Sequence, residues 1–413
     1  MTSVCLVVQN DYEFDVRVRR KAEALVAAGY YVDVLALRSA RTTKTYALNG
    51  VNVRTVSLRK KRASVARYMF EYVTFLVWAF LRVSIQMPWR RYAVIDVNTL
   101  PDFLIFAGAL ARRMGAKLLL DMHEITPEFF ISKYDTPDRS IVVGLLKRIE
   151  KCSFDFADRV ITINAPIEQL LATRGLPLSK STVIMNAADE TRFERRPAAG
   201  GADIRTASAA TFVMMYHGTL TGIYGVESAV EAFSIVHEEM PGAEFWILGD
   251  GPEKASLERR TAELGIASKV RLLGWRPPDE VPAWLTRCDV GVLPMRRDVF
   301  LDYAFPNKLS EYIIMSKPVI VPRLSAIRHY FSEDAMLYCE PNNSQDLARQ
   351  MVRAYRDRGA HAERAARARD EYTPIRWELM KERYLRLIEE LCGRGSRTLS
   401  PARSAEVTAT APR

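Results

Sequence analysis

The stretch that decides the fold is TFVMMYHGTLTGIYGVESAVEAFSIVHEE, which runs from Thr211 to Glu239. It opens with TFVMMYHG, an apolar run of strand length, and closes with VESAVEAFSIVHEE, whose apolar residues repeat at helical spacing. A short glycine-containing loop joins the two. A buried strand followed by an amphipathic helix is the repeating unit of an α/β domain with a parallel sheet.

The same alternation of strand and helix extends in both directions from this stretch. Downstream, further strands are predicted at AEFWILGDG, KVRLLGW, DVGVLPM, KPVIVP and AMLYCE. Upstream, strands are predicted at VCLVVQ, YYVDVLAL, YAVIDVN, AKLLLDMHE, RVITIN and STVIMN. We therefore predict an α/β protein with two doubly wound, Rossmann-like domains that face each other across a cleft, where small anionic ligands bind.

Between the two series of strands the apolar periodicity is lost. The sequence FERRPAAGGADIRTASAA consists largely of small and polar residues, which predicts a linker over residues 196–210. The predicted domains are then 1–195 and 211–371, in keeping with a chain of 413 residues. The polar, basic end of the chain predicts a disordered tail over residues 393–413.

Composition narrows the class of protein. Hydrophobic residues make up 48% of the chain and charged residues 26%, which is ordinary for a soluble globular protein. The five cysteines are scattered without a C-x-x-C pair, which argues against a disulfide framework or a zinc site and fits a reducing cytoplasm. The N-terminus lacks the order of a signal peptide. A net charge of +10 favours an anionic partner, either nucleic acid, anionic lipid or a phosphorylated small molecule.

Nucleic acid ranks lowest of these partners, because the basic residues are scattered and no recognised binding motif is present. A membrane surface ranks higher because of the aromatic stretch between residues 68 and 92. Between Glu71 and Arg82 lie ten uncharged residues, which as a helix span about 15 Å, half of a bilayer core. We expect this stretch not to cross a membrane. The basic flanks at residues 59–62 and 89–91 favour a helix that lies on a membrane surface, and a buried helix pair is the alternative.

Polar residues follow several of the predicted strands. His123 and Glu124 come directly after the strand in AKLLLDMHE, at the carboxyl end where α/β enzymes place reacting groups. A histidine at this position can donate a hydrogen bond to a substrate hydroxyl or stabilise developing charge. A structural histidine in a loop is the alternative.

Three loops of the second domain add candidate ligand contacts. Gly218 allows a tight turn beside Thr219, and backbone N–H groups there could face a phosphate. Gly249 ends another strand, and Trp275 with Arg276 occupies a loop where a nucleobase could stack. Each loop is also explained by turn chemistry alone, so the prediction depends on all of them lying at one edge of the sheet.

The segment FPNKLSEYI, from Phe305 to Ile313, places a cation and an anion one turn apart at a helix entry. An exposed ion pair of this kind stabilises a helix by only a few tenths of a kcal/mol. If the helix begins at the same sheet edge, Asn307 and Lys308 lie where a diphosphate would bind. Glu311 could then accept two hydrogen bonds from a ribose diol.

The order of these motifs resembles the family-4 (group 1) retaining glycosyltransferases of the GT-B fold, and most closely the bacterial members that build polysaccharide or lipid-linked glycans. The resemblance covers nearly the whole chain and is carried by the following segments: DVRVRRKAEALVAAGYYVDVL, LLLDMHEITPE, VIMNAADETRF, YHGTLTGIYGVESAVEAF, ILGDGPEKASLERRTAELGIASKVRLLGW and PNKLSEYIIMSKPVI. It implies transfer of a hexose from a nucleotide-sugar donor with retention of configuration, without a metal or other cofactor.

The resemblance also implies roles for individual residues. His123, with Glu124 beside it, corresponds to the active-site histidine near the donor sugar. Gly218 corresponds to the glycine beside the diphosphate, and Glu311 to the second glutamate of an E-x7-E motif that holds the ribose. The first glutamate of that motif falls at Tyr303, whose neighbour Asp302 is a possible substitute.

A second departure concerns the loop after Gly218, where related sequences usually carry a basic residue and this chain has Ile223. A departing nucleoside diphosphate needs a positive charge nearby. Lys308 is the first candidate to supply it, and Arg296 or Arg297 is the second.

The resemblance divides the two substrates between the domains. The donor is expected on the 211–371 domain, and the acceptor on the 1–195 domain near Arg17, Arg20 and the aromatic stretch. A final helix at residues 372–392 is expected to return to the first domain.

We therefore predict a glycosyltransferase that is cytoplasmic and attached peripherally to the inner face of the plasma membrane. Two alternatives stay open. A nucleotide-sugar isomerase or epimerase on the same scaffold would convert the donor without an acceptor. A catalytically weak partner of another transferase would bind the donor without turnover, which the departures at Tyr303 and Ile223 favour.

Overall fold

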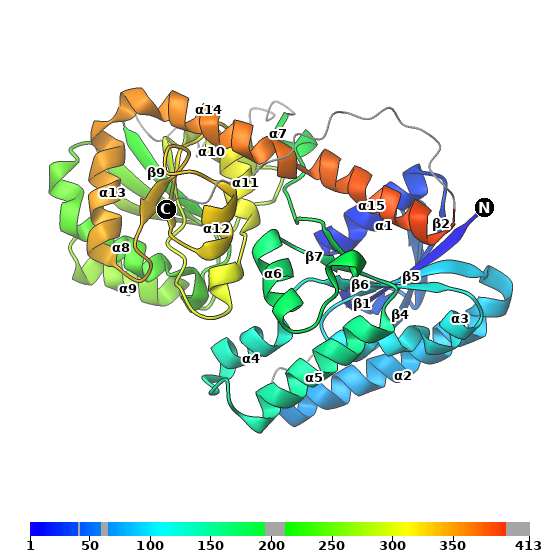
Figure 1. Cartoon of the computed structure of the whole chain (residues 1–413). Helices are drawn as coiled ribbons and strands as arrows, with labels where there is room; N and C mark the ends of the chain where they lie inside the picture. Colours follow the sequence, from blue (N-terminus) through cyan, green and yellow to red (C-terminus); the bar gives the residue numbers. More distant parts are fainter. Residues whose placement is uncertain (40–41, 59–64, 195–210, 394–413) are drawn as a thin grey trace, which may run out of the picture. The chain divides into compact units, whose positions relative to one another are not determined.

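The computed structural model describes residues 1–39, 42–58, 65–194 and 211–393 (Figure 1). The predicted linker at 196–210, the basic cluster at 59–62 and the predicted tail beyond residue 393 lie outside these residues. Two sheets with helices on their faces make up the described chain, so the predicted pair of Rossmann-like sheets is confirmed.

The first sheet has the strand order β3-β4-β2-β1-β5-β6-β7-β8. Its strand pairs β1–β2, β2–β4, β6–β7 and β7–β8 are parallel, whereas β3 runs antiparallel to β4. The strands are β1 (Ser3–Asp11), β2 (Tyr31–Leu37), β3 (Thr45–Leu48), β4 (Val51–Val56), β5 (Tyr92–Asn98), β6 (Lys117–Met122), β7 (Arg159–Thr162) and β8 (Ser181–Val183).

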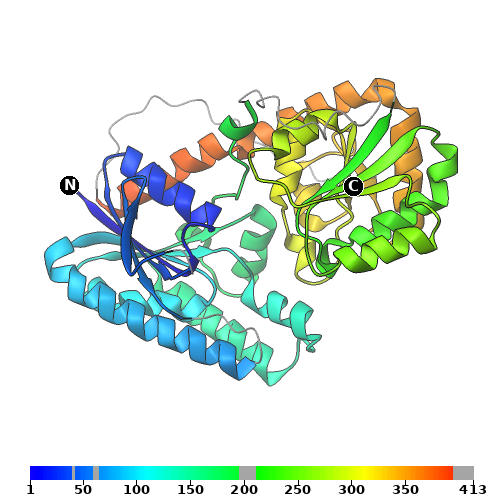
Figure 2. The same ribbon diagram turned by 180° about the vertical axis from the view of Figure 1, so that it is seen from behind.

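The apolar spacing of LPDFLIFAGALARRMG predicts one helix that ends at Gly115, and the structure differs there. The segment LPDFLIFAGALARRMG forms a 3₁₀ helix, Asp102–Gly108, and a short α3 (Ala109–Arg113) rather than one continuous helix. The remaining helices are α1 (Val16–Ala27), α2 (Val65–Arg90), α4 (Thr126–Tyr134), α5 (Ile141–Phe156), α6 (Ala165–Thr173) and α7 (Thr191–Glu194). Figures 1 and 2 show α1 and α2 on opposite faces of the β1–β2–β4 region, so both faces of these strands are covered.

The second sheet has the strand order β11-β10-β9-β12-β13-β14, and every one of its five strand pairs is parallel. The chain moves outward from β9 in one direction and then from β12 in the other, which makes the gap between these two strands a topological switch point. The strands are β9 (Phe212–His217), β10 (Ala243–Leu248), β11 (Val270–Gly274), β12 (Val290–Val292), β13 (Val319–Pro322) and β14 (Leu337–Cys339).

Helices cover both faces of the second sheet. Figure 1 shows α8, α9 and α13 together on one side of it and α11 and α12 on the other. The helices are α8 (Val226–Val236), α9 (Lys254–Glu263), α10 (Val281–Arg287), α11 (Asn307–Ile314), α12 (Ser325–Tyr330), α13 (Ser344–Arg356), α14 (His361–Tyr372) and α15 (Trp377–Leu391).

The chain divides into two compact units. The first consists of Met1–Asp96, Ala107–Leu118 and the described residues from Glu382 onward, and the second of Val97–Phe106 and Leu119–Lys381. The predicted domain limits at residues 195 and 211 stay a prediction.

A buried ion pair joins three elements of the first unit. Lys21 Nζ of α1 lies 3.1 Å from Asp96 Oδ2 of β5, and both side chains are almost completely buried. Tyr384 of α15 donates a hydrogen bond of 2.7 Å to the same carboxylate oxygen. A buried charge is tolerated only when it is paired and hydrogen-bonded, so these contacts depend strongly on one another.

Helix α2 extends well beyond the ten uncharged residues between Glu71 and Arg82. In the part of the chain that the structure describes, Arg67–Arg90 is long and apolar enough to cross a membrane, and 22% of its most apolar window is buried. One face of α2, with Phe75, Ala79 and Val83, is buried in the fold, as expected for a helix packed at the surface of a domain. The opposite face exposes Phe70, Val73, Val77, Leu81, Ile85 and Trp89.

Candidate functional site

The candidate site lies at the carboxyl ends of β9 and β12, beside the switch point of the second sheet. Lys308, in the first turn of α11, extends its ammonium group to the residues after β9. Its Nζ donates a 2.8 Å hydrogen bond to the Tyr216 hydroxyl and lies 3.7 Å from the centre of the Tyr224 ring. The Tyr216 hydroxyl in turn donates to the carbonyl of Thr219. The cation is therefore held against the loop that follows Gly218.

The environment of Lys308 lowers its affinity for a proton. The side chain is half-buried between two tyrosine rings, and desolvation lowers the pKa of Lys308 to about 7, although the nearby Glu311 opposes this shift. The lysine is thus close to the point at which its charge changes at neutral pH. An anion placed beside the ammonium would stabilise its charged form.

Glu311, one turn after Lys308, is engaged by a histidine that the sequence analysis did not single out. His217, the last residue of β9, is buried and has its Nε2 2.6 Å from Glu311 Oε2. The imidazole packs edge-on against Tyr312, with ring centroids 4.8 Å apart. Because one carboxylate oxygen is fixed by the imidazole, the orientation of Glu311 is set before any ligand arrives. Its side chain keeps 22% of its surface exposed.

Glycines allow the loops of this site to approach each other. A Cβ atom at Gly249, after β10, would lie 1.9 Å from the carbonyl oxygen of Gly218, after β9. A Cβ atom at Gly225 would lie 2.1 Å from the carbonyl oxygen of Pro294, after β12. No side chain fits at either position. The ends of three neighbouring strands are thereby brought into backbone contact.

Arg296 approaches the same loop from the segment after β12. Its backbone N–H donates to the carbonyl of Ile223, and its Cγ lies 3.5 Å from the Cβ position of Gly225. Arg296 is exposed, so its guanidinium is accessible to solvent. The loop that contains Ile223 has no basic residue at that position, and it is contacted by both Lys308 and Arg296.

The structure thus brings together several of the predicted donor-binding residues. Gly218, Gly249, Arg296, Lys308 and Glu311 meet around the ends of β9, β10 and β12. Two cations and a fixed carboxylate at this edge suit a ligand that combines phosphate groups with vicinal hydroxyls, whereas the backbone N–H groups of Gly218 and Leu220 already donate to the carbonyls of Leu248 and Asp250.

Apart from Tyr303, four other residues are predicted to contact the donor. Thr219 and Asn307 are exposed at the same edge, and Trp275 after β11 is 64% exposed. The Arg276 guanidinium lies over the Trp284 ring at 5.2 Å. Roles for these residues stay predictions.

His123 lies on the first sheet, directly after β6. Its Nε2 is 3.2 Å from Asp121 Oδ2, and its backbone N–H donates to the Thr99 hydroxyl, which follows β5. The side chain is 8% exposed, and the adjacent Glu124 is half-buried. The carboxylate of Asp121 fixes the imidazole as an orienting partner would in an active site.

Comparison with known proteins identifies the class of both halves. Residues 15–187 match the family model described as a glycosyl transferase 4-like domain, and residues 211–357 match the model described as glycosyl transferases group 1. The chain belongs to the group 1 glycosyltransferases. The prediction that this protein is a glycosyltransferase is therefore confirmed. Its two Rossmann-like sheets are those of the GT-B fold.

Individual relatives agree with this classification. The chain is 26% identical over 277 residues to a probable glycosyltransferase, WbjE, of Pseudomonas aeruginosa, which is 66% of this chain and 68% of the relative. It is 28% identical over 195 residues to the putative colanic acid biosynthesis glycosyltransferase WcaL of Escherichia coli, covering 46% of each chain. The structure of Anabaena HepE in complex with UDP has a TM-score of 0.70 and 16% identity, over 94% of this chain and 100% of HepE.

The structure shows the surroundings of the two positions, Tyr303 and Ile223, at which this glycosyltransferase departs from the predicted motifs. Asp302, the possible substitute for a glutamate at Tyr303, already contacts Arg297 at 2.9 Å and accepts a 2.5 Å hydrogen bond from the Ser325 hydroxyl. The Arg297 guanidinium is thereby paired, which leaves Lys308 and Arg296 as the cations beside the Ile223 loop. The carbonyl of Tyr303 accepts a hydrogen bond from Asn164.

Arg17 and Arg20, the predicted acceptor contacts, lie on α1 in the first unit and are both half-buried. Their role stays a prediction. Among the residues that the structure describes, no three histidine, cysteine or acidic side chains are grouped to hold a metal ion.

Tyr216, Tyr224 and His217 were not predicted as site residues, because they contact Lys308 and Glu311, which lie far away in the sequence. One signal was available, however. His217 ends a buried strand just as His123 follows one, so the rule that selected His123 also applies to His217.

Proposed function

We propose that this glycosyltransferase transfers a sugar, with retention of configuration and without a metal, from a nucleotide-sugar donor to a glycan or lipid-linked acceptor in polysaccharide biosynthesis. The observation that carries the proposal is the position of Lys308 against the Gly218 loop. A cation there can replace the basic residue that the loop lacks at Ile223 and can neutralise the donor diphosphate. The UDP complex of HepE and the name of WcaL support the donor and acceptor classes.

The residues around Lys308 divide the recognition of the donor. Lys308 and Arg296 hold the diphosphate. Glu311, oriented by His217, accepts hydrogen bonds from the ribose diol. His123 acts near the donor sugar. We assign no covalent nucleophile, and the acceptor attacks from the face that the diphosphate leaves, which agrees with retention.

Replacement of Lys308 tests this proposal most directly. Lys308→Met keeps the apolar stem but removes the charge, and should weaken donor binding by about 10- to 100-fold, the effect of losing a hydrogen bond to a charged group. Isothermal titration with UDP-, GDP- and ADP-sugars measures this effect and selects the donor. Lys317→Met, just beyond the other end of α11, is the matched control. Equal donor affinity in the two variants would assign the anchoring role to Arg296.

The low pKa of Lys308 adds a pH dependence to the same experiment. Only the ammonium form of Lys308 attracts a diphosphate, so above about pH 7 the lysine must take up a proton when the donor binds. Affinity should therefore be steady below pH 7 and fall above it, by up to about tenfold per pH unit. The Lys308→Met variant should show no such decline. A wild-type affinity that stays constant from pH 6 to 9 would contradict this assignment.

We further propose that the enzyme attaches to the cytoplasmic face of the plasma membrane through α2. The exposed apolar stripe from Phe70 to Trp89 repeats every three to four residues, as in helices that lie in a membrane interface. Helix α3, which contacts α2, exposes Leu110, and Met114 directly after this helix is exposed next to two arginines, 112 and 113. Apolar side chains flanked by cations fit an anionic lipid surface.

Charged substitutions in the stripe test this attachment. The double variant Val77→Glu/Leu81→Glu should bind vesicles of phosphatidylcholine and phosphatidylglycerol at least about 10-fold more weakly, since it removes apolar area and adds negative charge. Ile235→Glu, at an equally exposed apolar position on α8, is the control. Sedimentation with vesicles measures both. Unchanged binding of the double variant would exclude α2 as the membrane contact.

A further inference from the structure

A large cavity of the second unit is lined by neither Lys308 nor Glu311. It has a volume of about 770 Å³ and opens among α4, α5, α6 and the segment from Arg297 to Tyr303. Sites for small molecules are commonly 300–1,000 Å³ in volume. The cavity is therefore large enough for a ligand of its own.

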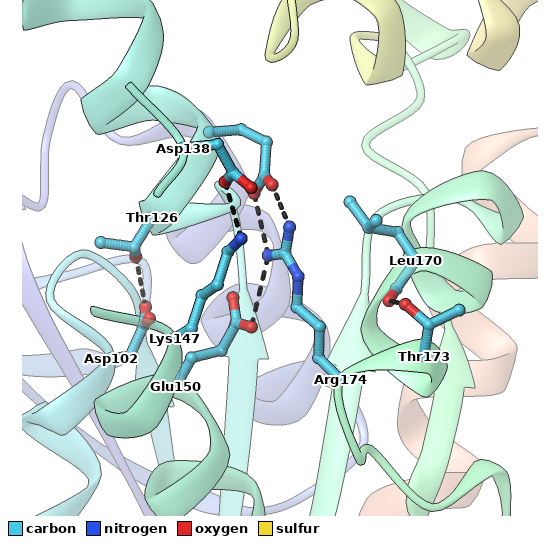
Figure 3. Close-up of polar contacts among 9 residues, drawn as sticks. Asp102, Thr126, Asp138, Lys147, Glu150, Leu170, Thr173 and Arg174 are labelled. Carbon is cyan, nitrogen blue, oxygen red and sulfur yellow. Dashed lines mark hydrogen bonds and ion pairs between the residues drawn. The ribbon is translucent and has the colours of Figure 1, made fainter. Parts of the chain in front are cut away.

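The charges that line this cavity are already balanced. Lys147 Nζ lies 2.6 Å from Asp138, as Figure 3 shows. Arg174, after α6, pairs with Glu128 of α4 and lies 3.4 Å from Glu150 of α5. Arg297 pairs with Asp302 at 2.9 Å. Since each of these cations has a carboxylate partner, the cavity holds no concentrated positive charge for a phosphorylated ligand.

The same pairs suit a ligand rich in hydroxyl groups. A carboxylate can accept more hydrogen bonds than one cation provides, and a guanidinium has five N–H donors. The Arg174 guanidinium is held by carboxylates from two different helices, which fixes its position in advance. A hydroxyl group can both donate to such a carboxylate and accept from such a guanidinium.

Apolar side chains complete the lining. Ile131, Leu170, Val299 and the ring of Tyr303 line the cavity, and Val299 is 49% exposed. Paired charges combined with apolar walls match a neutral sugar, whose ring carries hydroxyl groups at its edge and C–H groups on its faces. A second cavity of about 540 Å³ shares Leu170 and Tyr303 as lining residues, which leaves room for more than one sugar.

One wall of the cavity is formed by the segment of chain that connects Arg296 to α11, two parts of the donor site. The segment that forms one of its walls begins directly after Arg296, which lies against the Gly218 loop, and ends at Tyr303, four residues before α11 begins. We propose that this cavity binds the neutral glycan of the acceptor. The inference rests on the proposed function and deepens it by assigning a place and a chemical class to the acceptor.

Filling the cavity tests the inference. Val299→Trp inserts a large ring at an exposed position of the wall, and Ile235→Trp makes the same kind of change on an exposed part of α8. The probes are neutral methyl glycosides of glucose, galactose, mannose and rhamnose, disaccharides of the same sugars, and a mannose 6-phosphate glycoside. Saturation-transfer NMR measures their binding, and titration of the nucleotide-sugar measures donor binding in parallel.

We expect at least one neutral disaccharide to bind the wild type and the Ile235→Trp variant, and to bind Val299→Trp at least about tenfold more weakly. Donor affinity should be equal in all three proteins. The inference is overturned if no neutral sugar binds a protein that binds its donor, if Val299→Trp binds sugar as well as the control, or if only the phosphorylated sugar binds. Failure of donor binding in the wild type would instead refute the proposed function.

Discussion

Replacing His123 by asparagine is expected to lower the rate of sugar transfer by about 10²- to 10⁴-fold, the usual contribution of a positioned acid–base or charge-stabilising group. Asparagine can still donate a hydrogen bond to Asp121, so the local structure should persist. The backbone N–H of residue 123 also keeps its bond to Thr99. Single-turnover transfer from the donor selected by titration measures the rate, and donor affinity should change little.

The control for this experiment is His237→Asn, in a histidine at the end of α8 that bonds a nearby carbonyl. It should leave transfer unchanged. The melting temperature of the His123 variant should stay near that of the wild type, and a large drop would mean that the histidine is structural. A wild-type protein that binds its donor but never transfers it, even with crude lipid acceptor, would be a weak partner of another transferase.

Lys21→Met is expected to lower the free energy of unfolding of the first unit by about 3–5 kcal/mol, the cost of breaking a buried ion pair from one side. The carboxylate of Asp96 has no exposed surface, so water cannot replace the lost ammonium. Its hydrogen bond from Tyr384 remains, but a neutral hydroxyl does not replace the positive charge of the ammonium. Urea unfolding followed by circular dichroism measures the loss.

A second variant separates the charge effect from a packing effect. Lys21→Met/Asp96→Asn removes both charges and keeps an oxygen that can accept from Tyr384. It should be more stable than Lys21→Met alone, because no unbalanced charge is left in the core. If the double variant is the less stable of the two, the single substitution acts through packing and the ion pair is of minor importance.

Much of the fold could be predicted because its signals are local. The predicted strand TFVMMYHG became β9 (Phe212–His217), and the helix expected from FPNKLSEYI begins at Asn307. The strand β4 and its antiparallel neighbour β3 were not predicted; the four residues of β3 are alternately exposed and half-buried at a sheet edge and carry little apolar signal. The helix after β5 was predicted as one piece, although its first part is a 3₁₀ helix.

The candidate site could be predicted only in part, because its geometry depends on contacts between distant residues. The positions of Lys308 and Glu311 on one helix face followed from their spacing. Their partners, Tyr216 and His217, lie more than 90 positions earlier in the chain. The resemblance made Lys308 the first candidate for the cation missing beside Ile223, but no local pattern indicates that Lys308, on a helix that begins 84 residues later, contacts this loop.

The contact between Gly218 and Gly249 has a mechanical consequence. The two turns approach without an intervening side chain, and the Gly218 N–H donates a 2.8 Å hydrogen bond to the Leu248 carbonyl, so we expect the turns after β9 and β10 to shift as one piece. A displacement that a ligand causes in one turn should then move the other turn as well. Natural variation in sugar preference would then arise from side chains mounted on this piece, while its backbone shape is preserved.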